Sequence, residues 1–125
     1  MRLLLDTNAL IWWLDDPALL AQPAREAIED GSIAVAVSAA TAFEIRTKAA
    51  IGKLTFDGDI AVHMKREGFD ELPVTVAHAV AAGSLPLIHK DPFDRLLIGQ
   101  ARCERMTVAT RDATFQRYGV PVLAA

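Results

Sequence analysis

Short apolar runs, separated by polar and turn-forming residues, indicate where the chain forms buried β-strands. The three strongest are residues 2–6, 33–37 and 106–110. A continuous apolar run of this length is typical of a strand that is covered on both faces, as in a parallel sheet. Two weaker runs predict edge strands: residues 72–74, which are few, and residues 120–123, where Pro121 cannot donate a hydrogen bond to a neighbouring strand.

Segments with helical periodicity lie between these strands. They cover residues 9–14, 17–30, 38–51, 59–67, 75–82 and 92–104. Ser38 and Thr75 are good helix N-caps, and Pro92 suits the first position of a helix. Strands that alternate with helices predict an α/β fold, here a three-layer α/β/α arrangement around a mostly parallel sheet. We expect one domain that spans residues 1–125.

The composition suits a cytoplasmic protein with a substantial core. Hydrophobic residues make up 52% of the chain, and Cys103 is the only cysteine, which excludes a disulfide and a cysteine-based metal site. No apolar run approaches the roughly 18 residues of a membrane span, so we expect no membrane contact.

Two acids follow strong strands. Asp6 ends the strand predicted at residues 2–6, and Asp112 comes two residues after the strand at residues 106–110. Parallel strands end at the same edge of a sheet, and open α/β sheets bind ligands there. Asp6 could instead cap the helix that follows it.

Two further acids lie on helices that start from the same edge. Glu44 is one to two turns into the helix after residues 33–37, and Asp94 falls on the core-facing stripe of the helix at residues 92–104. A capping role for Glu44 is disfavoured because Ser38 is the better cap. Asp94 could simply be an acid favoured by the helix dipole.

Four carboxylates in one crevice need a compensating charge. Two unit charges 4 Å apart repel by about 4 kcal/mol at an effective dielectric constant near 20. Oxygen ligands without cysteine or clustered histidine favour Mg²⁺ or Mn²⁺, ions that act on phosphate substrates. The net charge of −3 argues against a nucleic-acid partner. Setting four carboxylates aside, however, leaves 12 acidic residues against 13 basic ones, so RNA is not excluded.

Four segments resemble the motifs of PIN-domain nucleases, and in particular of VapC toxins. They are residues 5–8, 37–54, 89–101 and 108–120. The third segment, which contains Asp91-Pro92-Phe93-Asp94-Arg95, is the most specific. The sequence departs from the family at Phe43, where many relatives carry Trp, and at Gly99, where Ala is usual and a small packing difference is expected.

The resemblance implies an endoribonuclease that uses Mg²⁺ or Mn²⁺ to hydrolyse RNA phosphodiester bonds. It implies that Asp6, Glu44, Asp94 and Asp112 are the catalytic, metal-binding quartet. It also implies a toxin that is inhibited by a cognate antitoxin protein, and a homodimer that forms a heterotetramer or larger assembly with that antitoxin.

Other residues beside the motif acids could support this site. Asn8 and Thr110 are candidates for holding the acids, although turn and cap chemistry would explain both. Arg95 and Lys48 are candidates for RNA-backbone contacts, and either could pair with a site carboxylate instead. No histidine stands at a telling spacing from an acid, and only His89 lies near a motif.

Two other functions compete with this interpretation. A metal-dependent phosphatase of the haloacid-dehalogenase type needs Asp-x-Asp after the first strand, and Thr7-Asn8 follows Asp6 here. A non-catalytic RNA-binding or interaction module on the same fold is the other alternative. The presence of all four acids argues against an inactive site.

Overall fold

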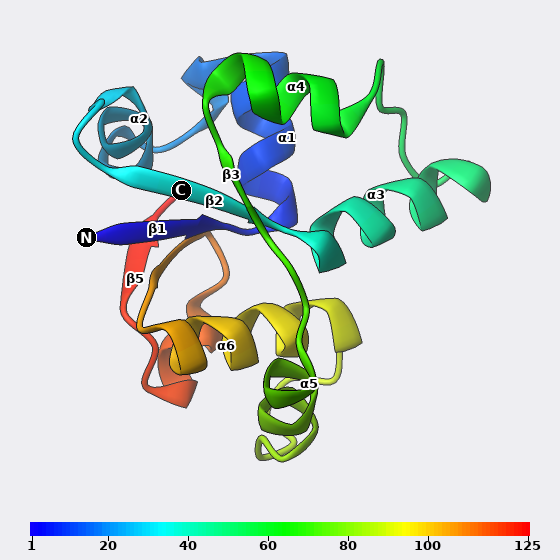
Figure 1. The fold of residues 1–125 in the computed structure, drawn as a ribbon, viewed down its shortest axis with the longest axis vertical. Coiled ribbons are helices and arrows are strands. Elements are labelled where there is room, and N and C mark those ends of the chain that lie inside the picture. Colours follow the sequence, from blue (N-terminus) through cyan, green and yellow to red (C-terminus); the bar gives the residue numbers. More distant parts are fainter.

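The computed structural model describes residues 1–125 and contains one five-stranded sheet in which every neighbouring pair is parallel. The strand order is β3-β2-β1-β4-β5 (Figure 1). The strands are β1 (Arg2–Leu5), β2 (Ala34–Ser38), β3 (Asp70–Leu72), β4 (Thr107–Thr110) and β5 (Val122–Ala124). The predicted parallel sheet is confirmed. The chain adds β2 and β3 on one side of β1 and then β4 and β5 on the other, so the order reverses beside β1.

Helices cover both faces of the sheet, which confirms the predicted three layers. The helices are α1 (Thr7–Asp15), α2 (Gln22–Glu29), α3 (Ala39–Ala50), α4 (Ile60–Glu67), α5 (Val76–Gly83) and α6 (Pro92–Glu104), with 3-10 turns at Pro17–Leu19 and Ala113–Tyr118. Figure 1 shows α1, α2 and α4 on one side of the sheet and α5 and α6 on the other. None of the helices is long and apolar enough to cross a membrane.

The central strand β1 explains why a continuous apolar run predicts a strand here. Leu3 and Leu5 pack into the core below α1 and α2, whereas Leu4 packs into the opposite core with Leu97 and Ile98 of α6. All three leucines are fully buried. Burying each leucine side chain contributes about 1.5–3 kcal/mol, so β1 joins the two cores.

The predicted helix at residues 17–30 is wrong as one unit. The structure has a 3-10 turn at Pro17–Leu19 and then a separate helix, α2, in which Pro23 lies in the first turn. A proline inside a longer helix would lose an N–H donor and its ring would clash with the carbonyl four residues back. Pro23 therefore marks the start of a helix. The prediction of a single helix followed the apolar periodicity and gave this proline too little weight.

The two edge strands are displaced by about two residues from the prediction. β3 pairs with β2 through Asp70–Leu72 rather than residues 72–74, because Pro73 follows at once and cannot donate to the ladder. β5 begins at Val122, immediately after Pro121. Proline thus marks a strand boundary in both places.

Candidate metal centre

Asp6 and Asp112 lie at the carboxyl ends of the neighbouring strands β1 and β4. Asp6 is buried, and its Oδ1 accepts a hydrogen bond from the Ala9 N–H at 2.7 Å. The Asp112 Oδ1 accepts from the Thr114 N–H at 2.9 Å. Each aspartate is therefore an N-cap, which for Asp6 is the alternative role suggested by the sequence. Each also stands where the strand order reverses, which is where open parallel sheets bind ligands.

Glu44 and Asp94 approach from helices that begin at the same edge. Ser38, at the end of β2, caps α3 as predicted, and Glu44 follows within this helix. The buried Glu44 carboxylate accepts from the Thr7 hydroxyl at 2.6 Å and pairs with the Lys48 ammonium. Asp94 lies in the first turn of α6, which Asp91 caps.

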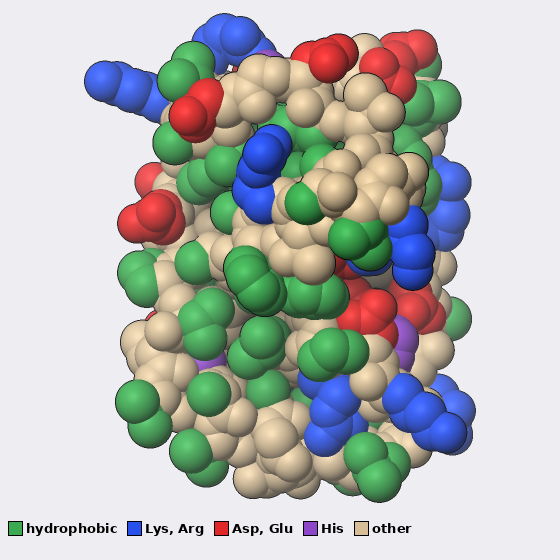
Figure 2. All heavy atoms as spheres, turned by 90° about the vertical axis from the view of Figure 1, so that its right-hand side faces the viewer, with side chains coloured by type: hydrophobic (Ala, Val, Ile, Leu, Met, Phe, Trp, Pro, Cys, Tyr) green, Lys and Arg blue, Asp and Glu red, His purple; other side chains and the backbone are tan.

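These four acids line one polar cavity of about 340 Å³. Its lining also includes Asn8, Lys48, Asp91 and Arg111, and Trp12 is its single hydrophobic member. Figure 2 looks onto this edge of the molecule, where acidic side chains gather in a hollow beside a histidine, with lysine and arginine side chains above and below. The structure thus brings together four acids from four separate parts of the sequence.

Burial and mutual repulsion raise the pKa of two of these acids. For Asp94, burial followed by the charge of Asp91 raises the pKa to about 7, against an ordinary value of 3.8, although His89 opposes the change. Burial also raises the pKa of Asp6, while hydrogen bonds from the Thr110 side chain and the Ala9 backbone partly offset it. Both carboxylates therefore resist ionisation in the absence of a compensating cation.

Asp112 and Lys48 show the opposite effect, because each has partners that favour its charged form. Burial works to raise the pKa of Asp112, but hydrogen bonds from Thr114 and His89 outweigh it, and the net pKa is lowered. The hydrogen bond to Glu44 raises the pKa of Lys48. The site therefore contains one readily ionised aspartate, and Lys48 and Arg111 are the cationic side chains of its lining.

The residues expected to support the acids have different surroundings. Thr110 is buried between two of them: its Oγ1 accepts from the Asp112 N–H at 3.0 Å, and its side chain hydrogen-bonds Asp6. Asn8 is exposed and lines the cavity. Thr110 is therefore tied to two acids, whereas Asn8 is placed to meet a ligand.

The two basic residues expected to contact RNA are both engaged within the chain. Lys48 pairs with Glu44, which is the alternative partner that the sequence left open. The Arg95 guanidinium donates to four backbone carbonyls, those of Ala82, Leu85, Pro86 and His89, at 2.9–3.1 Å. These bonds hold the loop before α6 and engage the Arg95 guanidinium within the chain.

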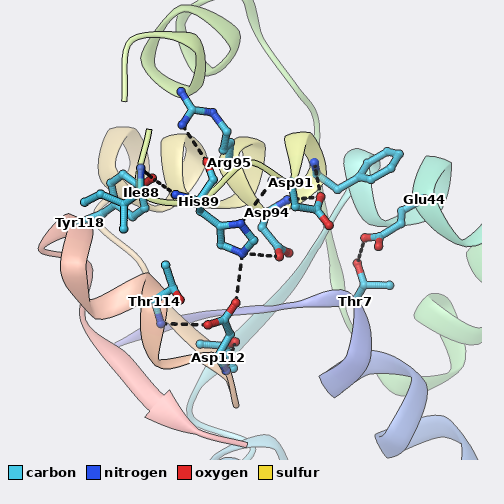
Figure 3. A network of polar contacts seen from close by, with 12 residues as sticks. Thr7, Glu44, Ile88, His89, Asp91, Asp94, Arg95, Asp112, Thr114 and Tyr118 are labelled. Atoms are coloured by element: carbon cyan, nitrogen blue, oxygen red, sulfur yellow. Dashed lines mark hydrogen bonds and ion pairs between the residues drawn. The ribbon is translucent and has the colours of Figure 1, made fainter. Parts of the chain in front are cut away.

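His89 is the residue whose position the sequence analysis missed. Its Nε2 lies 2.9 Å from Oδ2 of Asp94 and 3.0 Å from Oδ2 of Asp112 (Figure 3). It belongs to the loop between α5 and α6, where no periodicity fixes the direction of a side chain. The sequence feature that could have predicted its position is the Asp91 cap. This cap starts α6 beside β4 and so brings the residues before it next to Asp112.

The donor atoms fit a hard divalent cation. Carboxylate oxygens predominate, and the lone thiol of Cys103 is exposed at the far end of α6. Asp94 and Asp112 can each offer a carboxylate oxygen within 4.8 Å of the other. Crowded carboxylates with raised pKa values are the arrangement that Mg²⁺ or Mn²⁺ would relieve.

Fold and cavity together define an α/β protein with an acidic site at the switch point of a parallel sheet. The chain belongs to the PIN domain family, whose model matches residues 3–121. Among curated proteins, it is 29% identical over 126 residues to Ribonuclease VapC22 of Mycobacterium tuberculosis; the match covers 94% of this chain and 92% of that protein.

Solved structures show the same fold. FitAcB from Neisseria gonorrhoeae is 25% identical with a TM-score of 0.58, and the match covers 98% of this chain and 96% of that one. DNA-bound VapBC from Salmonella typhimurium is 20% identical with a TM-score of 0.72, covering 98% and 96%. VapBC2 from Rickettsia felis, bound to a promoter DNA fragment, is 16% identical with a TM-score of 0.71, covering 98% and 97%.

Proposed function

We propose that this chain is a Mg²⁺- or Mn²⁺-dependent endoribonuclease that hydrolyses RNA phosphodiester bonds. The observation that carries the proposal is the convergence of Asp6, Glu44, Asp94 and Asp112 on one cavity. The family and the name of the relative VapC22, a ribonuclease, favour a nuclease over a phosphatase or a non-catalytic module.

The four acids divide the work by their surroundings. Asp6 and Asp94, whose pKa values are raised, are the groups that most need a cation, and we assign them to hold it against the scissile phosphate. Glu44 and Asp112 complete the site and orient the attacking water. A bound divalent cation supplies polarisation of the phosphoryl oxygen and lowers the pKa of water.

Two side chains keep the Glu44 carboxylate in place. The Thr7 hydroxyl donates to one carboxylate oxygen, and Lys48 pairs with the other. The Lys48 side chain is 40% exposed at the cavity wall. It can therefore stay near Glu44 and still approach an RNA phosphate, and we retain it as the candidate backbone contact.

The decisive experiment is an RNA cleavage assay with mapping of the new 5′ ends. The wild-type protein should cut total RNA with Mg²⁺ or Mn²⁺. Asp6→Asn and Asp94→Asn should each lose more than about 100-fold in rate, since each removes a charge that holds the cation. Glu29→Gln, an exposed acid outside the cavity, is the matched control. Wild-type rates in either aspartate variant would overturn the assignment.

We further propose that the chain is the toxin of a toxin–antitoxin pair and works as a homodimer that an antitoxin protein inhibits. The resemblance to VapC toxins supports this, as do the structural relatives described as VapBC complexes. Expression of the chain alone should arrest the growth of a bacterial host, and Asp94→Asn should not. Equal growth arrest by both proteins would contradict a toxicity that depends on this site.

A further inference from the structure

His89 reaches the acids from behind the cavity. Its side chain is 18% exposed, and it is absent from the residues that line the cavity, whereas both of its carboxylate partners line it. Figure 3 shows the imidazole between Asp94 of α6 and Asp112 after β4. Nε2 is within hydrogen-bond distance of one oxygen from each.

The backbone around His89 is fixed by residues that have no part in the cavity. The Tyr118 hydroxyl oxygen accepts from the N–H groups of Ile88 at 3.1 Å and His89 at 2.7 Å, and its O–H donates to the Pro86 carbonyl at 2.7 Å. Arg95 donates to the His89 carbonyl at 3.1 Å. The imidazole therefore projects from a loop that is held at several points.

One further contact decides which ring nitrogen carries the hydrogen. The Asp91 N–H donates to His89 Nδ1 at 3.2 Å, so Nδ1 must present its lone pair. The neutral ring then carries its hydrogen on Nε2. That N–H points at the two carboxylate oxygens, and a nitrogen that bears a hydrogen cannot bind a cation through the same position.

We propose that His89 is a positioning residue whose Nε2–H holds the Asp94 and Asp112 carboxylates side by side at the cavity, so that the two acids are preformed as a pair of cation ligands. The inference rests on the proposed function for the cation itself. It goes further by giving His89 a task that it performs through the acids and without touching the ion. Groups that orient metal ligands in this way typically change affinity by 10–100-fold when removed.

Two substitutions separate the hydrogen-bond donor from the rest of the imidazole. In His89→Asn, the amide ends near the position of Nδ1, so it can still meet the Asp91 N–H but cannot reach the carboxylates. In His89→Gln, the amide reaches the position of Nε2 and can donate to them. We expect Mn²⁺ affinity, measured by electron paramagnetic resonance titration, to fall roughly 10–100-fold in His89→Asn and to be largely kept in His89→Gln.

His63→Asn is the matched control, because His63 is a half-buried residue of α4 that lies outside the cavity lining and hydrogen-bonds only Asp57 and Arg66. Asp94→Asn is included to separate the two proposals. If the wild-type protein and Asp94→Asn both fail to bind Mn²⁺, the proposed metal function itself fails. If the wild type binds and His89→Asn binds equally well, only the role of His89 is overturned.

A second measurement needs no variant and so is independent of whether His89→Asn folds. Electron spin echo spectra of Mn²⁺ bound to the wild-type protein should lack the ¹⁴N coupling of a directly coordinated imidazole. A strong coupling of this kind would make His89 a ligand and overturn the positioning role. Circular dichroism of both variants checks that any loss of affinity occurs in folded protein.

Discussion

At the scale of single residues, capping and site chemistry occur in the same side chains. Asp6 and Asp112 each use Oδ1 to accept a backbone N–H. That bond fixes the rotamer, and for Asp112 it leaves Oδ2 to meet His89. From the sequence, helix capping and a role in the site were alternatives. In the structure, the capping hydrogen bond also orients the carboxylate in the site. Strand ends made these two acids predictable.

Residues whose roles depend on loop geometry were harder to predict. His89 and Arg95 stand beside the third motif, but their partners lie on other segments. Arg95 donates to carbonyls six to thirteen residues before it, and His89 reaches Asp112, 23 residues after it. No local period encodes such contacts, so their direction emerges only once the loop is packed against β4.

Asp94 makes the metal-free protein sensitive to pH in a defined direction. Its pKa is about 7 in the folded chain, against 3.8 for an ordinary aspartate. The folded state therefore holds this proton more tightly than the unfolded state, and stability is lost as pH rises from about 4 to 7. In EDTA, Asp94→Asn should melt at a higher temperature than the wild type at pH 8, and the difference should vanish near pH 4.

Thermal unfolding followed by circular dichroism across this pH range tests the prediction for Asp94. The Glu29→Gln variant controls for the loss of one negative charge from the surface. If wild type and Asp94→Asn differed by the same amount at every pH, the raised pKa would be wrong.

At the scale of elements, the sequence predicts where helix α6 begins but not how closely helix α5 packs against it. Pro92 and the Asp91 cap fix where α6 begins, and both are visible in the sequence. Nothing local reveals how closely α5 lies against it. A Cβ placed on Gly99 would meet the backbone of Ala82 in α5, at 2.8 Å from N and 3.0 Å from Cα. The sequence led us to expect only a small packing difference at Gly99. The close approach of α5 instead requires glycine there.

Gly99→Ala should consequently destabilise the protein although alanine is the better helix former. Helix propensity favours alanine by up to about 1 kcal/mol, but overpacking against a backbone costs typically 1–3 kcal/mol. We expect a net loss of about 1–2 kcal/mol in the free energy of unfolding, measured by urea denaturation.

Gly83→Ala is the matched control for this prediction. Gly83 is an exposed residue of α5, and an added Cβ there meets nothing within 4 Å. It should be neutral or stabilising by roughly 0.5–1 kcal/mol, as for other exposed helical glycines. A stabilising Gly99→Ala would show that α5 can move away from α6 at little cost.

At the scale of the whole molecule, the site exists because the strand order reverses beside β1. The alternation of strands and helices was enough to predict a parallel sheet and hence a shared edge for Asp6 and Asp112. It was not enough to predict the split at Pro23 or the register of the edge strands, because those depend on single prolines. The acids follow from the topology, whereas their supporting contacts follow from packing.

This arrangement predicts how a cation affects the stability of the entire chain. A cation bound to Asp6, Glu44, Asp94 and Asp112 would tie together the end of β1, two helices and the end of β4, segments that are up to 106 residues apart. The unfolded chain cannot present these acids together. At a free concentration 100 times Kd, binding to the folded state alone adds about 2.7 kcal/mol, and Tm should rise by roughly 10 °C.

Simple screening of the crowded acids would also raise Tm, so the ionic strength must be matched. Melting curves in Mn²⁺ or Mg²⁺ should therefore be compared with curves in NaCl of equal ionic strength. The exposed part of the repulsion is screened by either salt, but only a cation that coordinates the acids should give the full increase, and Asp94→Asn should lose it. An equal rise in NaCl would mean that the four acids form a repulsive cluster that any salt relieves, and the specific centre would be disproved at the level of the whole fold.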